Sequence, residues 1–262
     1  MAAYNVGLGS IFGGIGAVIN KNPEEKTGKV FVKGLWQGAV GGYLIYESKN
    51  IISKIPEKEK WEYSWAAKFV NAAGTSIVEN AASNRGLWEQ WHFHIGFNRI
   101  ELYTKDEIKI RYKIMPISLV LTGITASKTK FEIKKSLQTG ELIFSDSNLR
   151  TERNWRAYVL GNIMVVDDSV FDDYFVFAHE IIHIYQYYDY NFINSYTNPL
   201  KENWSGKSRT FNKINNLFYF DIQGPILTGL RRLAGKSGNC HFDNFFEYEA
   251  EFFAQRGRVI CP

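Results

Sequence analysis

Glycines that recur at intervals of four residues are the feature that most limits how this chain can fold. Gly34, Gly38 and Gly42 lie on one face of any helix formed by Gly28–Glu47. A glycine inside a helix costs up to about 1 kcal/mol relative to alanine, so a row of glycines on one face indicates the close approach of another backbone. Two flanking segments are also rich in glycine or alanine: Asn5–Ile19 and Glu57–Ser83. Residues 1–85 are therefore predicted to form a Gly/Ala-rich helical region.

This N-terminal region could pack in more than one environment. Helix faces built from small residues pack closely in soluble hairpins and also in membranes. No uninterrupted apolar run reaches the roughly 18–20 residues that a spanning helix needs, and Lys33, Lys68 and Glu79 interrupt the better candidates. Two interpretations stay open, a compact helical packing module and a membrane-associated element on the bilayer surface or partly inserted in it. True membrane spans are the least favoured.

The composition narrows the expected partners. Aromatic residues make up 16% of the chain, a share that suits wide apolar contacts and membrane boundaries. We therefore expect the N-terminal helices and an aromatic-rich surface to be the parts that would meet a membrane surface or a membrane-protein complex. The net charge of +4 is small and is spread along the chain, which indicates no nucleic-acid partner.

The pattern changes after residue 86. Strand-like alternation of apolar and polar residues follows in five segments: residues 92–104, 107–115, 118–125, 129–135 and 141–144. Ala157–Val166 resembles one further strand, and Asn191–Asn212 resembles a loop. Four later segments are predicted to be helical: Phe175–Tyr188, Lys213–Phe220, Ile226–Ala234 and Phe245–Arg256. The predicted fold class is α+β, with an antiparallel or mixed sheet in residues 86–262.

The segment Phe177–Gln186 reads FAHEIIHIYQ and contains the pattern His-Glu-x-x-His. Residues four apart lie on one face of a helix, so the neutral imidazoles of His179 and His183 can reach one Zn²⁺ at about 2.0–2.1 Å. Glu180 is adjacent and can take a proton from a water molecule that the metal holds. An ordinary amphipathic helix with half-buried histidines would carry the same residues, so the pattern alone leaves both interpretations open.

Two further features favour the metal site. The strand at Ala157–Val166 leads into the helix through a short acidic turn, where Asp172 or Asp173 could cap the helix. Downstream, a second predicted helix reads FFEYEAEFFA over Phe245–Ala254 and contains the motif Glu-x-x-Ala-Glu.

Together these motifs resemble the gluzincin class of zinc metallopeptidases, and locally they are most similar to bacterial zincin-like domains. The resemblance covers about residues 155–256 and is absent from residues 1–150. The residues that match the pattern are Ile163, Ala178, His179, Glu180, His183, Gln186, Glu247, Ala250 and Glu251. It implies a zincin-like domain in which an edge strand beside the His-Glu-x-x-His helix binds the substrate.

The resemblance also implies a role for each site residue. His179, His183 and Glu247 would hold one Zn²⁺, and Glu180 would be the general base. Glu251 would hydrogen-bond a ligand histidine; the class more often has Asp at this position, which leaves the geometry of Glu251 open. Glu249 lies about 200° around the helix from Glu247 and is expected to face away from the metal.

Three other groups of residues remain. The oxyanion of a hydrolase needs a donor, and His241 is the first candidate, ahead of Tyr248, Tyr187 and Tyr185. His92 and His94 lie on one face of a predicted strand and could bind metal, but the aromatic residues around them favour an aromatic strand face. Cys240 and Cys261 bracket the last helix, either as a disulfide or as two free thiols.

Two functions from different classes follow as expectations. The first is a zinc-dependent peptidase that hydrolyses peptide bonds in peptide or protein substrates. The second is a non-catalytic, metallopeptidase-like structural subunit of a bacterial envelope or outer-membrane protein complex. Under either function, a membrane-associated location on the periplasmic side of the bacterial envelope is favoured over the cytoplasm.

Overall fold

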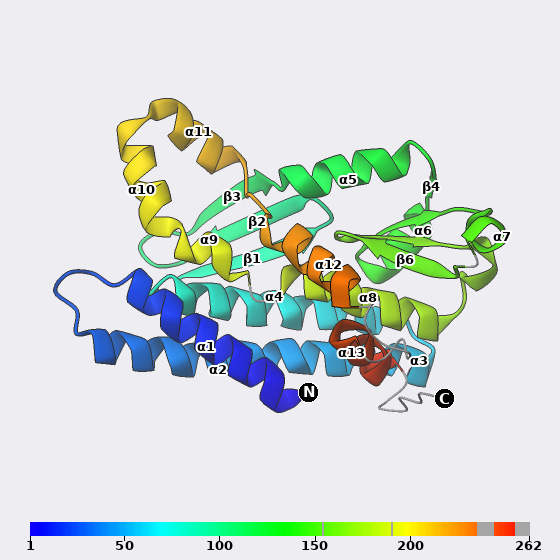
Figure 1. The fold of residues 1–262 in the computed structure, drawn as a ribbon, viewed down its shortest axis with the longest axis horizontal. Coiled ribbons are helices and arrows are strands. Elements are labelled where there is room, and N and C mark those ends of the chain that lie inside the picture. The colour runs from blue at the N-terminus through cyan, green and yellow to red at the C-terminus, as the bar shows by residue number, and fades with distance from the viewer. Residues whose placement is uncertain (154, 190, 235–243, 255–262) are drawn as a thin grey trace. The chain divides into compact units, whose positions relative to one another are not determined.

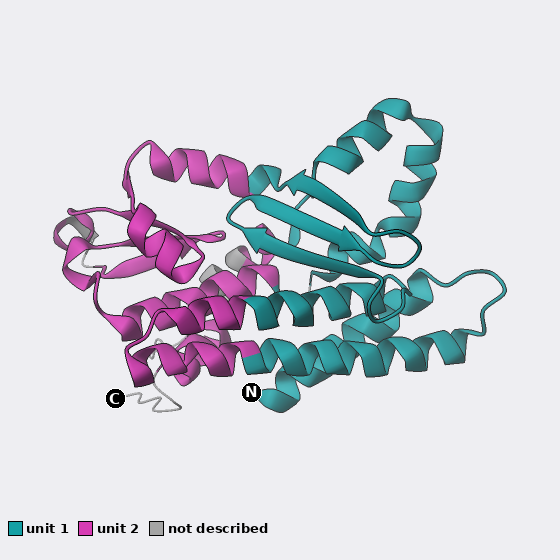
Figure 2. Ribbon diagram, turned by 180° about the vertical axis from the view of Figure 1, so that it is seen from behind, with its two compact units in different colours: residues 1–47, 69–117, 189–223 teal, residues 48–68, 118–188, 224–262 magenta. Residues whose placement is uncertain are grey.

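The computed structural model describes residues 1–153, 155–189, 191–234 and 244–254 (Figure 1). Helices account for 64% of the structure and strands for 14%, which confirms the α+β class. The chain divides into two compact units (Figure 2): residues 1–47, 69–117 and 189–223 form unit 1, and residues 48–68, 118–188 and 224–262 form unit 2. Each unit contains segments from both sides of residue 85, so the units do not follow the boundary expected from the sequence.

The N-terminal region is helical, as predicted. It forms four helices: α1 (Ala2–Ile19), α2 (Thr27–Ile52), α3 (Lys54–Lys58) and α4 (Glu62–Ala82). Within unit 1 the glycine rows bring backbones into contact. A methyl group added at Gly38 would overlap the carbonyl oxygen of Gly9, and one added at Gly41 would lie 2.7 Å from the carbonyl oxygen of Gly74. Only residues without a side chain allow this approach, which confirms the prediction of close packing.

Helix α1 is long and apolar enough to span a membrane, although the sequence analysis found no uninterrupted apolar run of that length. Including Ala2–Tyr4, its 18 residues carry no charge and have a mean hydropathy of 1.5. By length and composition it could cross a bilayer, a property it shares with many core helices; one third of it is buried inside the structure.

Unit 1 also contains a three-stranded antiparallel sheet in the order β1-β2-β3. Its strands are β1 (Gln90–Ile95), β2 (Asn98–Tyr103) and β3 (Lys109–Ile114). Three helices complete the unit: α9 (Phe192–Tyr196), α10 (Asn198–Lys207) and α11 (Arg209–Leu217). The expectation of a loop over Asn191–Asn212 is therefore wrong. The residues that suggested a loop begin helices instead, because Pro199 lies in the first turn of α10 and Ser208 caps α11 by accepting from the backbone N–H of Phe211.

Unit 2 is built around a four-stranded mixed sheet in the order β4-β5-β7-β6. Its strands are β4 (Lys130–Phe131), β5 (Leu142–Ser145), β6 (Ala157–Leu160) and β7 (Ile163–Val166). The pair β5·β7 is parallel, and the other two pairs are antiparallel. Helices of this unit include α5 (Pro116–Ala126), α6 (Ile133–Thr139), α7 (Leu149–Arg153), α8 (Tyr174–Tyr188), α12 (Gln223–Ala234) and α13 (Phe245–Ala254). Helix α8 packs on β6, β7, α3 and α13.

Three strand predictions in unit 2 need correction. Residues 118–125 belong to helix α5, whose buried side chains are Ser118, Thr122 and Thr125, at helical spacing. The apolar pattern of this segment suggested a strand, but tertiary packing overrides such local signals. Residues 129–135 divide between β4 and α6. Ala157–Val166 is a hairpin of β6 and β7, in which Gly161 adopts a φ of 67° that a side chain would disfavour.

Candidate metal centre

A capping residue fixes the start of helix α8, and its buried side chains fix its rotation. The Oδ1 atom of Asp173 accepts from the backbone N–H groups of Phe175 and Val176, each at 3.1 Å, so Asp173 is the cap. A 3₁₀ turn at Asp168–Val170 connects β7 to this cap. From Phe177 onward nearly every side chain of α8 is buried, which fixes the rotation of the helix and therefore the direction of its histidines.

Three side chains from α8 and α13 converge on one point. The Nε2 atoms of His179 and His183 lie 3.2 Å apart, and the Oε2 atom of Glu247 lies 3.3 Å from the first and 3.1 Å from the second. Two atoms each bound at about 2.0–2.1 Å to one tetrahedral ion lie about 3.3 Å apart. The three atoms therefore have the spacing of one face of a coordination tetrahedron. This partly buried group could hold a metal ion, and it is the one such His, Cys, Asp and Glu group of three among the described residues.

The second ring nitrogen of His179 is held by Glu251. Its Nδ1 atom lies 3.3 Å from the Oε2 atom of Glu251, one turn after Glu247 on α13. The interaction turns the Nε2 atom toward the metal position and favours the tautomer in which Nε2 carries the lone pair. The longer side chain of Glu251, compared with the Asp of similar motifs, still reaches the ring.

The charges around the three ligand atoms determine which of these groups carries a proton when no metal is bound. Burial lowers the pKa of His179, but the carboxylates of Glu247 and Glu251 outweigh burial and raise it to about 10. Burial also tends to raise the pKa of Glu247, but its contacts with His179 and His183 lower it well below the usual range. At neutral pH a proton on His179 thus links the three ligand atoms. A metal ion must displace this proton, so binding is coupled to proton release.

A buried chain of hydrogen bonds holds His183 from the other side. The Nδ1 atom of His183 lies 2.8 Å from the Oε1 atom of Gln186, which as an acceptor requires a proton on Nδ1 and leaves the lone pair on Nε2. The Nε2 atom of Gln186 donates to Glu249 at 2.9 Å, and the ammonium of Lys49 donates to Glu249 at 2.9 Å. Gln186, Glu249 and Lys49 are all buried. They fix the tautomer and orientation of His183.

The sequence analysis missed part of this hydrogen-bond network. Gln186 belongs to the matched pattern but received no role, and Glu249 was expected only to face away. Lys49 lies 200 residues from Glu249 along the chain, so no local motif could connect them. The one available signal was Gln186 itself, because a glutamine three residues after a ligand histidine lies on the same helix face.

Glu180 is buried beside the two histidines on α8. Its negative charge is among the influences that raise the pKa of His179, which places it within electrostatic reach of the metal position. A cavity of about 20 Å³, enough for one water molecule, lies next to His183 and is also lined by Gln186, Val159 and Gly161. The edge strand β6 therefore contributes to the same cavity as the ligand histidine.

The remaining sequence candidates fall into two groups. His241, Cys240 and Cys261 lie outside the described residues. His92 and His94 are buried on one face of β1, but this face is polar, and Trp91 and Phe93 point to the other side. The ring nitrogens of His92 are occupied by the hydroxyls of Thr75 and Ser76, at 3.1 and 3.2 Å. The expected aromatic face is therefore wrong for these histidines, which belong to a hydrogen-bonded core.

No protein-family model, no curated protein and no solved structure matches this chain.

Proposed function

We propose that this chain is a zinc-dependent peptidase in which His179, His183 and Glu247 hold the metal and Glu180 is the general base. The observation that supports it most strongly is the convergence of two imidazole nitrogens and one carboxylate oxygen within 3.1–3.3 Å of one another. Three protein ligands leave one tetrahedral position for water or substrate, which is typical of catalytic zinc, whereas structural zinc is closed by four.

The choice of zinc rests on the donor set and on Glu180. Two histidines and one carboxylate are also used by non-haem iron(II) oxygenases. Those enzymes need no carboxylate base on the ligand helix, whereas metal-assisted hydrolysis does. The spacing of the donor atoms is that of a tetrahedral ion, and zinc prefers this geometry. The resemblance of the motifs to gluzincins also favours zinc.

Each residue has a distinct task in the proposed reaction. When bound, zinc lowers the pKa of a water molecule to about 7 and polarises the carbonyl of the substrate. Glu180 accepts the proton of the attacking water and returns it to the leaving amine. Glu251 and Gln186 keep the ligand histidines in the tautomers that face the metal. His241 remains the proposed donor to the oxyanion.

Strand β6 is suited to hold an extended peptide. It is the edge of its sheet, and Val159 lines the small cavity beside His183. Tyr158 and Leu160, on the opposite face of β6, line a mostly apolar cavity of about 270 Å³ together with residues of α5. A peptide that paired with this edge would direct alternate side chains to the two faces. We therefore expect a substrate with a large apolar side chain near the cleaved bond.

The alternative is a structural subunit that keeps the metal but not the reaction. Two helices of unit 1 present apolar rows to solvent, Ile11, Ile15 and Ile19 on α1 and Val32, Trp36 and Val40 on α2. Such rows suit a membrane surface or a membrane-protein complex. Glu180 argues against this alternative, because a purely structural metal site has no use for a general base.

Replacing Glu180 with Gln separates the two functions. The amide is nearly isosteric, so the zinc content should stay at that of the wild type, measured by elemental analysis. Because the amide cannot accept a proton, cleavage of a fluorogenic peptide library should fall by at least about 10²–10⁴-fold. Glu62→Gln is the matched control, since Glu62 is exposed on α4 and should change neither property.

Zinc-loaded wild type that cleaves no peptide, together with a Glu180→Gln variant that fully replaces the wild type in cells, would refute the peptidase and support the structural subunit. Cleavage that survives removal of zinc by a chelator would also refute it.

A further inference from the structure

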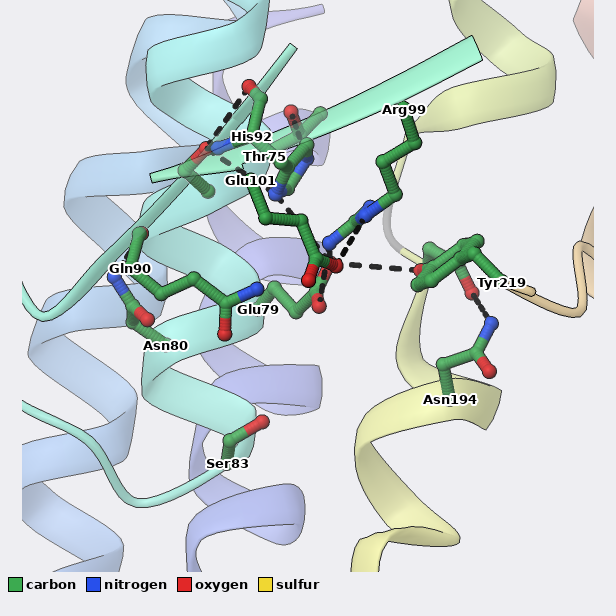
Figure 3. Close-up of polar contacts among 12 residues, drawn as sticks. Thr75, Glu79, Asn80, Ser83, Gln90, His92, Arg99, Glu101, Asn194 and Tyr219 are labelled. Carbon is green, nitrogen blue, oxygen red and sulfur yellow. Dashed lines mark hydrogen bonds and ion pairs between the residues drawn. The ribbon is translucent and has the colours of Figure 1, made fainter. Parts of the chain in front are cut away.

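Unit 1 contains a buried charged cluster that the proposed peptidase does not use (Figure 3). Its centre is the guanidinium of Arg99 on β2, which is fully buried. The Nη2 atom donates to both carboxylate oxygens of Glu79 at 2.9 and 3.0 Å, and the Nε atom donates to Glu101 at 2.7 Å. The ring of Tyr219 lies 3.8 Å from the guanidinium carbon. Arg99 thus offsets the charges of both carboxylates and holds them in place.

A polar cavity of about 240 Å³ lies against this cluster. Glu79, Glu101 and Tyr219 form part of its wall, and four basic side chains line it: Arg85, Arg111, Lys113 and Lys201. These side chains come from different elements, namely the segment before β1, strand β3 and helix α10. The cavity is therefore formed by the tertiary fold and not by one local stretch of sequence.

Arg99 already offsets the charges of Glu79 and Glu101, and the third carboxylate of the lining, Glu202, is exposed to solvent. Most of the basic groups, in contrast, have no carboxylate partner among the described residues. Lys113 lies 3.4 Å from Glu101, which is shared with Arg99. Among the described residues, no carboxylate forms an ion pair with Arg85, Arg111 or Lys201. Arg85 contacts the side-chain oxygen of Gln90, Arg111 lies over the ring of Tyr103, and Lys201 donates to two oxygens of Asn194. Three cations therefore face one cavity with only neutral partners.

The ionisation of Lys201 is consistent with a positive field in the cavity. Burial lowers its pKa most, Glu79 opposes this effect, and the positive charges of Lys113, Arg99 and Arg85 lower it further, to about 8. The ammonium is still mostly charged at neutral pH. A bound anion would offset the mutual repulsion of these groups.

We propose that this cavity binds a small ligand through an oxyanion, either a phosphate or a carboxylate group, held by Arg85, Arg111 and Lys201. Guanidinium groups bind both oxyanions through paired hydrogen bonds, and an ammonium adds a point charge. The volume lies just below the roughly 300–1,000 Å³ of pockets for drug-sized molecules, so the ligand is a small metabolite. This site is separate from the metal centre of unit 2 and does not depend on the proposed peptidase.

Calorimetric titration with sodium phosphate and with sodium succinate tests the proposal, with sodium chloride at matched ionic strength as the reference. Either probe should bind the full-length protein, and Lys201→Gln and Arg111→Gln should each weaken binding by about 10–100-fold, since each removes a charge-assisted hydrogen bond. Lys105→Gln is the matched control, because Lys105 is an exposed cation paired with Glu89 outside the cavity. It should leave the affinity within about twofold of the wild type.

Stronger binding of phosphate would identify a phosphate-bearing ligand, and stronger binding of succinate would identify a dicarboxylate. Circular dichroism should show that the variants fold, since the replaced side chains are partly exposed. The proposal is refuted if neither probe binds up to about 10 mM, which corresponds to a negligible affinity. It is also refuted if folded Lys201→Gln and Arg111→Gln bind as tightly as the Lys105→Gln control.

Discussion

The Arg99 cluster of unit 1 is built around a guanidinium, whereas the candidate metal centre of unit 2 is built around a point between three acceptor atoms. In unit 1, Glu79 and Glu101 converge on Arg99, and the chain itself supplies the cation. In unit 2, one potential ligand atom each of His179, His183 and Glu247 faces the other two. Without a metal, a proton on His179 reduces the repulsion between these atoms.

This difference suggests a way to distinguish a structural ion cluster from a candidate metal centre when no ion is bound. Carboxylates that already have a buried cation gain little from a second one. Acceptor atoms that face one another at the spacing of a coordination tetrahedron gain a great deal, because an ion replaces repulsion and a bound proton with three ligand bonds. His94 lies 3.1 Å from Arg99, so both arrangements contain histidine and glutamate, and composition alone does not separate them.

The largest effect is expected from removing the cation of unit 1. Arg99→Met leaves the buried Glu101 and the partly buried Glu79 without their guanidinium, and breaking a buried pair in this way costs about 3–5 kcal/mol. Urea unfolding should show this loss. Arg111→Met, which removes a partly exposed cation of the same unit, should cost less than about 1 kcal/mol.

The pH dependence sharpens the same prediction. Burial alone would raise the pKa of Glu101, but Arg99 and Lys113 lower it far below its usual value of 4.5. The folded-state pKa is depressed, so this stabilisation is fully present above about pH 4.5 and is lost as the pH falls below that value. The wild type should therefore lose stability in acid more steeply than Arg99→Met. Equal slopes would contradict the role given to Arg99.

The next effect concerns the metal ligands of unit 2. His179→Ala and His183→Ala should each lower the zinc content well below one ion per chain, because two protein ligands remain. In the wild type, a chelator should reduce hydrogen-exchange protection in α8 and α13 more than in β1–β3. An equal loss of protection in both regions, or unchanged zinc in either variant, would remove the distinction between the two clusters.

The smallest effect, a loss of zinc affinity, is expected from residues that contact the ligand histidines but not the metal position. Glu251→Ala and Gln186→Leu should each weaken zinc binding by about 10–100-fold, because each frees a ligand histidine to rotate or change tautomer. Competition with a zinc-binding dye measures this change. Tyr248→Phe, on the same helix as Glu251, should leave the affinity unchanged. Losses in the two variants no greater than in Tyr248→Phe would show that the histidines are held by packing alone.

The elements that the sequence predicted well are those in which local pattern and burial agree. The glycine rows predicted close helices, and the spacing of His179 and His183 predicted one helix face. Helix α5 was missed because tertiary packing, not local propensity, decides it: it buries its hydroxyl side chains and exposes Val120 and Ile124. Helices α9 and α10 and the first turn of α11 were missed because Pro199 and Ser208, which begin helices here, are residue types that are also common in loops. The Arg99 cluster was missed for another reason. Its members are ordinary strand and helix residues, and only the fold brings them together.

The contact between Lys49 and Glu249 has a consequence for how this protein can be divided. A fragment that starts at residue 86 would keep every ligand and every residue of the recognisable motif. It would also leave the Glu249 carboxylate without the ammonium that it contacts in the core of unit 2. Helix α2 thus supports the candidate metal centre through Lys49, although nothing in its local sequence indicates this role. A shortened chain that bound zinc poorly would not show that the ligands are misassigned, because the missing part is a helix that never touches the metal.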